Sequence, residues 1–345
     1  MIMNKSDAQA INSVRNKLGS RLVILGHHYQ HDEVITHTDY QGDSLELARK
    51  IPHLDAEYIV FCGVDFMAET AAILAQKSQK VLLPEHSASC VMAKMAPAPL
   101  VETVFKKLSQ TGQKVIPLAY VNSSAAIKAL CGKYGGSVCT SANAKTMLNW
   151  ALEQGDQVLF LPDSHLALNT GHQLGLDNSE LQILDIRKNG KNLQPTDLIQ
   201  KKMLIWPGVC AVHARFKSAQ IEVIRNKDPQ AKIIVHPECH PDLVQMADAT
   251  GSTSFIIKYV QEAPQDSRIY IGTECNLVKR LTKRYLGAKH IYPLHESFCS
   301  NMGKTNQAKL AALLQSLERA EPITVPADIR EKSAIALNTM LEVCS

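Results

Sequence analysis

Short apolar runs alternate with helical patterns along most of this chain of 345 residues. Nine runs are rich in β-branched or aromatic residues, and most lack the strict alternation of a half-exposed strand. Such runs are typical of strands buried on both faces of a parallel sheet, and helical stretches such as 65–77 and 276–287 lie between many of them. The pattern predicts an α/β fold. The nine predicted strands are 21–26, 57–63, 80–85, 114–121, 156–163, 202–208, 231–238, 267–274 and 289–296.

One order of features occurs three times along the chain. In each unit a strand ends in a polar loop, a turn of small residues opens a helix, a further strand ends in an acid, and a cysteine follows. The serine-to-acid spacings are 21, 22 and 22 residues, and the acid-to-cysteine spacings are 25, 47 and 25. The three sets are Ser44, Asp65 and Cys90; Ser141, Asp163 and Cys210; and Ser252, Glu274 and Cys299.

Three α/β units, each with a small parallel sheet, account for this repeat, although generic alternation of strands and helices is an alternative source of similar spacings. We expect domains at 1–95, 96–210 and 211–302, with the helical residues 303–345 packing back on the first. The polar insertion 176–200 is expected to be a surface excursion. Because ligands bind beyond the carboxyl ends of parallel strands, the repeated polar residues predict one site between the units.

Composition narrows the possible partners. The chain is 45% hydrophobic and 20% charged, with a net charge of +4, and it has no basic cluster interleaved with aromatic residues. Nucleic acid is therefore not an expected partner. The sequence has no apolar run of roughly 18 residues and no signal-peptide core near its start, so we expect a cytoplasmic protein with no membrane partner.

The nine cysteines are scattered singly and form no CxxC pair, which argues against a disulfide framework and a zinc ribbon. Three thiolates from separate loops can bind zinc or three corners of an iron–sulfur cube. The intervals of 120 and 89 residues between Cys90, Cys210 and Cys299 favour a cluster, since zinc sites usually contain closely spaced pairs. Three ligands leave one iron open as a Lewis acid. Spacing alone does not select these three cysteines, and Cys239 is the main rival ligand.

A set of short motifs between about residues 20 and 302 resembles the quinolinate synthase family closely and in the family's order. No single motif is specific, but the combination is. The motifs are GHHYQ (26–30), GDSLELA (42–48), GVDFMAE (63–69), SASCVMAKM (87–95), YVNSS (120–124), CTSANA (139–144), PGVCAVHARF (207–216), HPEC (236–239), GST (251–253) and HESFCSNM (295–302).

This resemblance implies three α/β sandwich domains related by pseudo-threefold symmetry, with the active site between them. It implies one [4Fe–4S] cluster per chain, on Cys90, Cys210 and Cys299, with the open iron as a Lewis acid for dehydration. The implied reaction is a transferase step of de novo NAD biosynthesis, in which iminoaspartate and dihydroxyacetone phosphate give quinolinate, phosphate and water. L-aspartate oxidase is the implied transient partner.

The resemblance also implies roles for individual side chains. His27, Tyr29 and Glu238 are the expected catalytic residues, with Tyr29 and Glu238 moving protons. The alternative for each is a structural hydrogen bond or ion pair. The expected substrate-binding residues are His27, Ser44, Tyr120, Asn122, Ser141, His213, His236, Glu238, Ser252 and Thr253.

The hydroxyl residues in this set, Ser44, Ser141, Ser252 and Thr253, precede predicted helices. They are expected to cap those helices, to bind substrate anions, or to do both. The acids Asp65 and Asp163 are expected to be caps, and neither they nor Glu274 are expected to be catalytic.

Two other functions remain open from the residues alone. One is a three-cysteine dehydratase of the aconitase type that acts on a hydroxy acid. The other is a non-enzymatic protein that binds a sugar phosphate or a carboxylate and buries free cysteines. Iron content after anaerobic purification separates the binding protein from the two enzymes.

Overall fold

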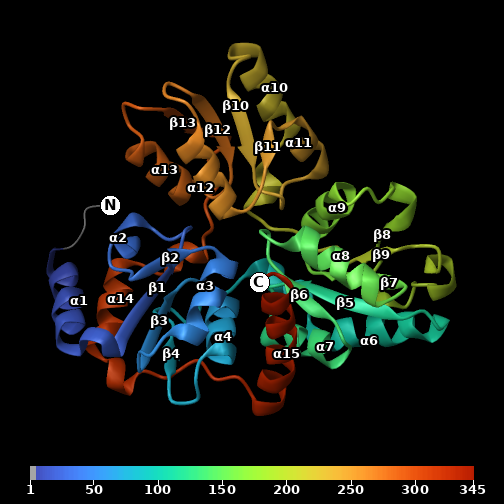
Figure 1. Ribbon diagram of the computed structural model, residues 1–345, viewed down its shortest axis with the longest axis horizontal. Coiled ribbons are helices and arrows are strands. Elements are labelled where there is room, and N and C mark those ends of the chain that lie inside the picture. The colour runs from blue at the N-terminus through green and yellow to red at the C-terminus, as the bar shows by residue number, and fades with distance from the viewer. Residues whose placement is uncertain (1–4) are drawn as a thin grey trace.

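The computed structural model describes residues 5–345 and arranges them as three α/β units around a common junction (Figure 1). Each unit contains one parallel sheet, of four, five and four strands in chain order, so the predicted fold class is confirmed. All nine predicted strands are present. Four further strands of two or three residues were not predicted: β2 (Tyr40–Gly42), β6 (Ser137–Cys139), β8 (Leu181–Ile183) and β11 (Ala249–Thr250).

The first unit has the strand order β2-β1-β3-β4. Every residue of its central strand β3 is buried, because helices cover both faces of the sheet. Its strands are β1 (Leu22–His27), β3 (Tyr58–Cys62) and β4 (Lys80–Leu82) beside β2, and its helices are α1 (Lys5–Leu18), α2 (Asp32–Ile35), α3 (Ser44–Lys50), α4 (Asp65–Leu74) and α5 (Val91–Lys94).

The second unit has the order β6-β5-β7-β9-β8. Its fifth strand, β8, comes from the insertion 176–200 and pairs with β9. The insertion is mostly exposed, as expected, but it also adds an edge strand to the sheet, which the sequence did not predict. The other elements are β5 (Val115–Tyr120), β7 (Gln157–Leu161), β9 (Met203–Ile205), α6 (Ala98–Leu108), α7 (Ala125–Lys133), α8 (Ala144–Gln154) and α9 (Ser164–Gln173).

The third unit repeats the order of the first, as β11-β10-β12-β13. It lies above the other two in the view of Figure 1. Its remaining elements are β10 (Lys232–Val235), β12 (Arg268–Gly272), β13 (His290–Pro293), α10 (Ser218–Lys227), α11 (Pro241–Met246), α12 (Thr253–Glu262) and α13 (Cys275–Arg284).

The two C-terminal helices pack against different units. Helix α14 (Gln307–Gln315) packs against α1 of the first unit, as expected for residues 303–345. Helix α15 (Ala327–Val343) instead packs mainly against α7 and β6 of the second unit, with a smaller contact to α4. Hydrogen bonds fix this position, because Ser333 Oγ donates to the Ala125 carbonyl at 2.8 Å and Ser137 Oγ donates to the Ala336 carbonyl at 3.0 Å.

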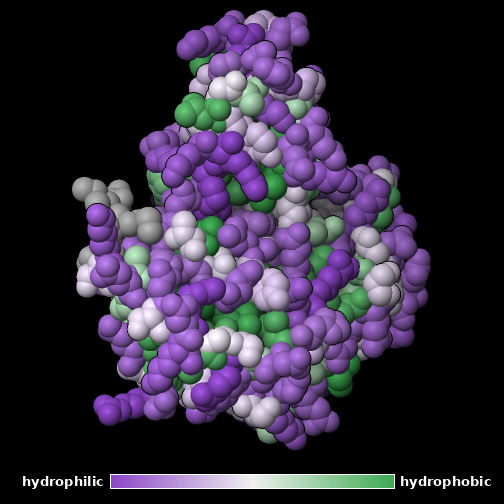
Figure 2. Space-filling view, turned by 60° about the vertical axis from the view of Figure 1, so that its left-hand side comes forward, coloured by the Kyte–Doolittle hydropathy of each residue, from purple (hydrophilic) through white to green (hydrophobic). Residues whose placement is uncertain are grey.

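Hydrophilic side chains cover most of the face shown in Figure 2, and hydrophobic ones gather in smaller patches. Among residues 5–345, no helix combines the length and the apolar character that a membrane crossing requires.

The close approach of α7 and α15 depends on Gly132. A Cβ atom at this position would collide with the backbone oxygen of Lys332. Alanine at an exposed helix site is normally about 1 kcal/mol better than glycine. We expect Gly132→Ala to do the opposite and to lower the free energy of unfolding by about 1–3 kcal/mol in urea titrations. Asn338→Ala on the exposed side of α15 should change it by less than about 0.5 kcal/mol. A Gly132→Ala chain as stable as the parent would contradict this packing.

Candidate active site

The carboxyl ends of the three sheets surround one cavity. Its empty volume, which includes space open to solvent, is about 980 Å³. The structure brings together every residue predicted for the site except Ser252. The first unit contributes His27, Tyr29, Ser44 and Cys90, the second Tyr120, Asn122, Ser141 and Cys210, and the third His213, His236, Glu238, Thr253 and Cys299.

Two helix starts explain why Ser252 is the exception. Ser44 and Thr253 are the first residues of α3 and α12, and the capping side chains are those of the residues before them, Asp43 and Ser252. The hydroxyl of Ser252 accepts the Phe255 amide at 3.3 Å and does not line the cavity. The expectation that Ser44 and Thr253 are caps was therefore wrong, and their hydroxyls face the cavity instead.

The same expectation was wrong for Ser141 and Asp65. The N-cap residues of α8 and α4 are Asn143 and Val64, and neither helix start has a side-chain cap hydrogen bond.

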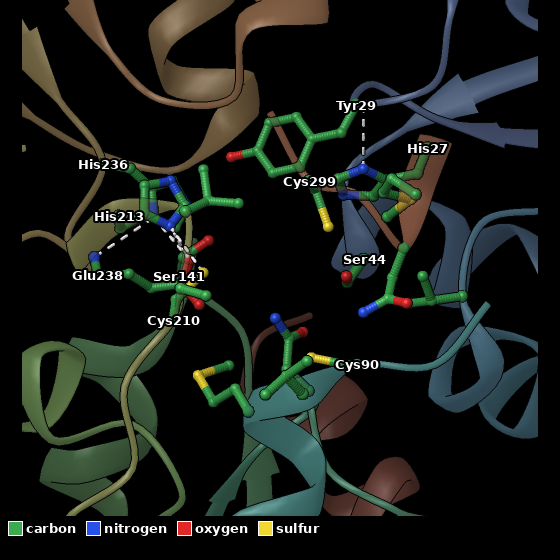
Figure 3. A pocket seen from close by; sticks show the side chains of 18 of the residues that line it. His27, Tyr29, Ser44, Cys90, Ser141, Cys210, His213, His236, Glu238 and Cys299 are labelled. Atoms are coloured by element: carbon green, nitrogen blue, oxygen red, sulfur yellow. Dashed lines mark hydrogen bonds and ion pairs between the residues drawn. The ribbon is translucent and has the colours of Figure 1, made fainter. Parts of the chain in front are cut away.

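Three cysteines, one from each repeat, face the cavity (Figure 3). All nine cysteines are free thiols. Burial raises the pKa of Cys90 to about 12, and burial also raises the pKa values of Cys210 and Cys299. These thiols are neutral near pH 7 until a metal displaces their protons. The rival Cys239 lies outside the cavity wall, and its thiol donates to the Gly272 carbonyl.

The donor set suits a sulfur-liganded metal group. Three sulfur ligands from separate loops match three corners of an iron–sulfur cube. Met92 and Met302 add buried, apolar side chains to the same wall. A single cation has a different set within reach, because Cys210 Sγ and one ligand atom each of His213 and Glu238 lie within 4.8 Å of one another.

Glu238 is a buried carboxylate between two histidines. Its Oε2 lies 2.6 Å from His213 Nδ1 and 3.3 Å from His236 Nδ1, and the two imidazole rings stack with centroids 4.4 Å apart. Burial acts to raise the pKa of Glu238, but the interactions with His213 and His236 prevail and lower it to about 2. Its second oxygen, Oε1, is buried and accepts no hydrogen bond from residues 5–345, so it is available to a substrate.

A chain of side chains connects Tyr29 to Glu238 across the cavity wall. The Tyr29 hydroxyl lies 2.7 Å from Thr273 Oγ1, which lies 3.1 Å from His213 Nε2. Thr253 Oγ1 also donates to the Tyr29 hydroxyl, at 3.3 Å. Burial raises the pKa of Tyr29 well above its ordinary value, so the phenol is protonated at neutral pH. Sequence reasoning missed Thr273, although its position at a strand end directly before the repeated acid Glu274 could have indicated it.

The chain matches the family described as quinolinate synthetase A protein over residues 9–342. It belongs to this family. A quinolinate synthase of Bacillus pumilus (strain SAFR-032) is 44% identical over 341 residues, which cover 96% of this chain and 92% of the relative. Those of Bacillus subtilis (strain 168) and Geobacillus sp. (strain WCH70) are 42% and 45% identical, with the same coverage of both chains. The resemblance drawn from the motifs is thereby confirmed.

In this member of the quinolinate synthetase A family, the loop that carries Tyr29 is held by another unit. Asn276 Nδ2 of α13 donates to the Tyr29 carbonyl at 3.1 Å. Arg280, one turn further along α13, donates to the His28 carbonyl at 2.8 Å and to the Gln30 carbonyl. The first and third units together therefore set the direction of the Tyr29 side chain.

The loop that carries Glu238 is held by the second unit in the same way. The Nδ2 of Asn169 on α9 donates to the carbonyls of Pro237 and Cys239, both at 2.8 Å. His165 Nδ1 lies 3.1 Å from the Glu238 carbonyl. Neither side chain lines the cavity, and both lie on a helix without a motif of its own, so no sequence signal indicated them.

Removal of the Asn169 amide leaves two buried carbonyls without their donor. We expect Asn169→Ala to lower the free energy of unfolding by about 1–3 kcal/mol in denaturant titrations. The matched control is Asn149→Ala, since Asn149 bonds only an exposed Glu153 on its own helix. That control should change stability by less than about 0.5 kcal/mol. Equal effects of the two substitutions would argue against the described role of Asn169.

Proposed function

We propose that this chain is a quinolinate synthase of de novo NAD biosynthesis that condenses iminoaspartate with dihydroxyacetone phosphate and releases quinolinate, phosphate and water. The family match over residues 9–342 carries this proposal, since all of the relatives named above are quinolinate synthases. The supporting feature is a cavity lined by hydroxyl, imidazole and thiol groups from three units. L-aspartate oxidase is the proposed source of iminoaspartate.

Cys90, Cys210 and Cys299 are the proposed ligands of one [4Fe–4S] cluster. The support is their convergence on one cavity from three units, as free thiols with apolar neighbours. A fourth cysteine is not part of the cavity wall formed by the described residues, so one corner would remain open to substrate. When bound, the cluster would supply a Lewis acid that eases the loss of hydroxide during dehydration.

Neutral hydrogen-bonding groups and one cation would hold the anionic substrates. Burial lowers the pKa values of His27 and His236 to about 3, so both imidazoles are neutral at pH 7 and bind a carboxylate through an N–H rather than through charge. The hydroxyls of Ser44, Ser141 and Thr253 line the same wall, and Arg215 is the cation among the described residues that line it. These groups suit the two carboxylates and the phosphate of the substrates.

Tyr120 and Asn122 would bind the carbonyl and hydroxyl end of the triose. Tyr120 is the last residue of β5, Asn122 lies two residues beyond it, and both line the cavity. The Oδ1 atom of Asn122 is buried and accepts no hydrogen bond from residues 5–345, so a substrate hydroxyl can donate to it.

Tyr29 and Glu238 would move the protons. The carboxylate of Glu238 is ionised at neutral pH, which makes it the base, whereas the phenol of Tyr29 is protonated, which makes it the donor. Thr273 and His213 lie between them and can return the proton from one to the other. Each dehydration needs both groups, because a proton leaves carbon as the hydroxide leaves.

The function is tested by purification without oxygen. We expect a brown protein with about four irons and four sulfides per chain, which forms quinolinate from iminoaspartate and dihydroxyacetone phosphate. A colourless, iron-free chain from strictly anaerobic expression would contradict the cluster. An iron-loaded chain that dehydrates a hydroxy acid and forms no quinolinate would instead identify a dehydratase of the aconitase type.

Glu238→Gln tests the proton transfer separately from the cluster. We expect quinolinate formation to fall by about 10²–10⁴-fold, the usual contribution of a general acid or base, with unchanged iron and sulfide content. Glu262→Gln on the exposed side of α12 is the control and should behave like the parent. Parental turnover in Glu238→Gln would remove this residue from the mechanism.

A further inference from the structure

We propose that two of the repeated acids, Asp65 and Glu274, are positioning residues that hold the loops of Cys90 and Cys299 in place for the cluster. Neither lines the cavity, so neither touches substrate. Each lies at the start of the helix that follows the third strand of its unit, and its carboxylate accepts the amide N–H of the cysteine of that unit. The inference rests on the proposed cluster.

The first unit shows the arrangement most simply. Oδ1 of Asp65 accepts the amide N–H of Cys90 at 3.2 Å and the amide of Phe66 at 2.8 Å. A backbone hydrogen bond runs in the opposite direction, from the amide of Asp65 to the carbonyl of Ala88 at 2.8 Å, and we call it the return bond. The residue two before the cysteine and the cysteine itself are therefore both bonded to one acid.

The third unit has the same side-chain bond, and its return bond comes from the residue after the acid. Oε1 of Glu274 accepts the amide N–H of Cys299 at 3.3 Å, and its Oε2 accepts the amide of Asn276 at 2.7 Å as the cap of α13. The return bond runs from the amide of Cys275 to the carbonyl of Ser297 at 2.9 Å. Ser297 again lies two residues before the cysteine. Glu274 is fully buried, so water does not compete for these bonds.

The second unit keeps only the return bond between backbone groups, despite its insertion. The amide of Ser164 donates to the carbonyl of Gly208, two residues before Cys210, at 2.8 Å. Asp163 caps α9 by accepting the Leu166 amide at 2.8 Å through Oδ1. Its other oxygen, Oδ2, is buried and accepts no hydrogen bond from residues 5–345, so the side chain of Asp163 does not bond the Cys210 loop. The acid-to-cysteine interval is 47 residues here and 25 in the other units, so the return bond does not depend on the number of residues between the acid and the cysteine.

These bonds matter because a metal ligand on a loop is only as well placed as its backbone. A carboxylate that holds the cysteine amide fixes the Cα–Cβ direction and hence the position of the sulfur. The acid is itself fixed, since it stands where a buried strand ends and a helix begins. In this way the sheet of each unit sets the position of the thiol in that unit, and the three sheets bring the thiols together.

The test removes the acceptor and measures cluster retention. Asp65→Ala and Glu274→Ala, each made anaerobically, are expected to release iron to a chelator on the order of tenfold faster than the parent, as for other supports of metal ligands. The decay of absorbance near 400 nm follows this loss, together with iron and sulfide per chain. Asp65→Asn should retain the cluster like the parent, because one oxygen of Asp65 accepts both amides and the Asn amide oxygen can replace it.

The control is Asp248→Ala in the third unit. This carboxylate accepts the Ile233 amide at 2.8 Å and pairs with Arg225, at a site away from the cysteines. The Asp248→Ala variant should lose iron at the same rate as the parent. Circular dichroism of the cluster-free chains checks that all variants fold.

Two results would overturn the inference: alanine variants that lose iron no faster than Asp248→Ala, or an Asp65→Asn variant as labile as Asp65→Ala. A parent chain that never binds iron would contradict the proposed cluster instead.

Discussion

The convergence of three parallel sheets on one junction is the constraint on which the rest of this molecule depends. Parallel strands direct all their carboxyl ends to one edge, and the loops beyond that edge carry the polar residues. Here three such edges surround a single cavity, so His27, Tyr120 and His236 meet although they lie far apart in the chain. One unit alone would present only a third of the site.

Burial at this junction decides the protonation states of the site. It keeps the phenol of Tyr29 and the cysteine thiols protonated and keeps His27 neutral. Glu238 differs because two histidines face one of its oxygens, and their interactions outweigh its desolvation. A base and an acid thus coexist within one chain of hydrogen bonds, as acid–base catalysis of a dehydration requires.

The cavity wall is supported by side chains that do not touch it. Asn276 and Arg280 hold the Tyr29 loop from the third unit, and Asn169 holds the Glu238 loop from the second. All of them bond backbone carbonyls, which any residue in the loop would offer. Motif reading therefore finds the residues that face substrate more easily than those that position them.

The sequence by itself determined the α/β class, the three units and nearly the whole set of cavity residues, because apolar runs and a spaced repeat are local properties of the chain. It did not determine which side chain caps a helix and which faces the cavity, as Ser44 and Ser252 illustrate. The packing of α15 on the second unit and the link through Thr273 were also decided only in the tertiary structure. The contact of Ser333 with Ala125 spans 208 residues and that of Tyr29 with Thr273 spans 244, and no local pattern of polarity encodes such contacts.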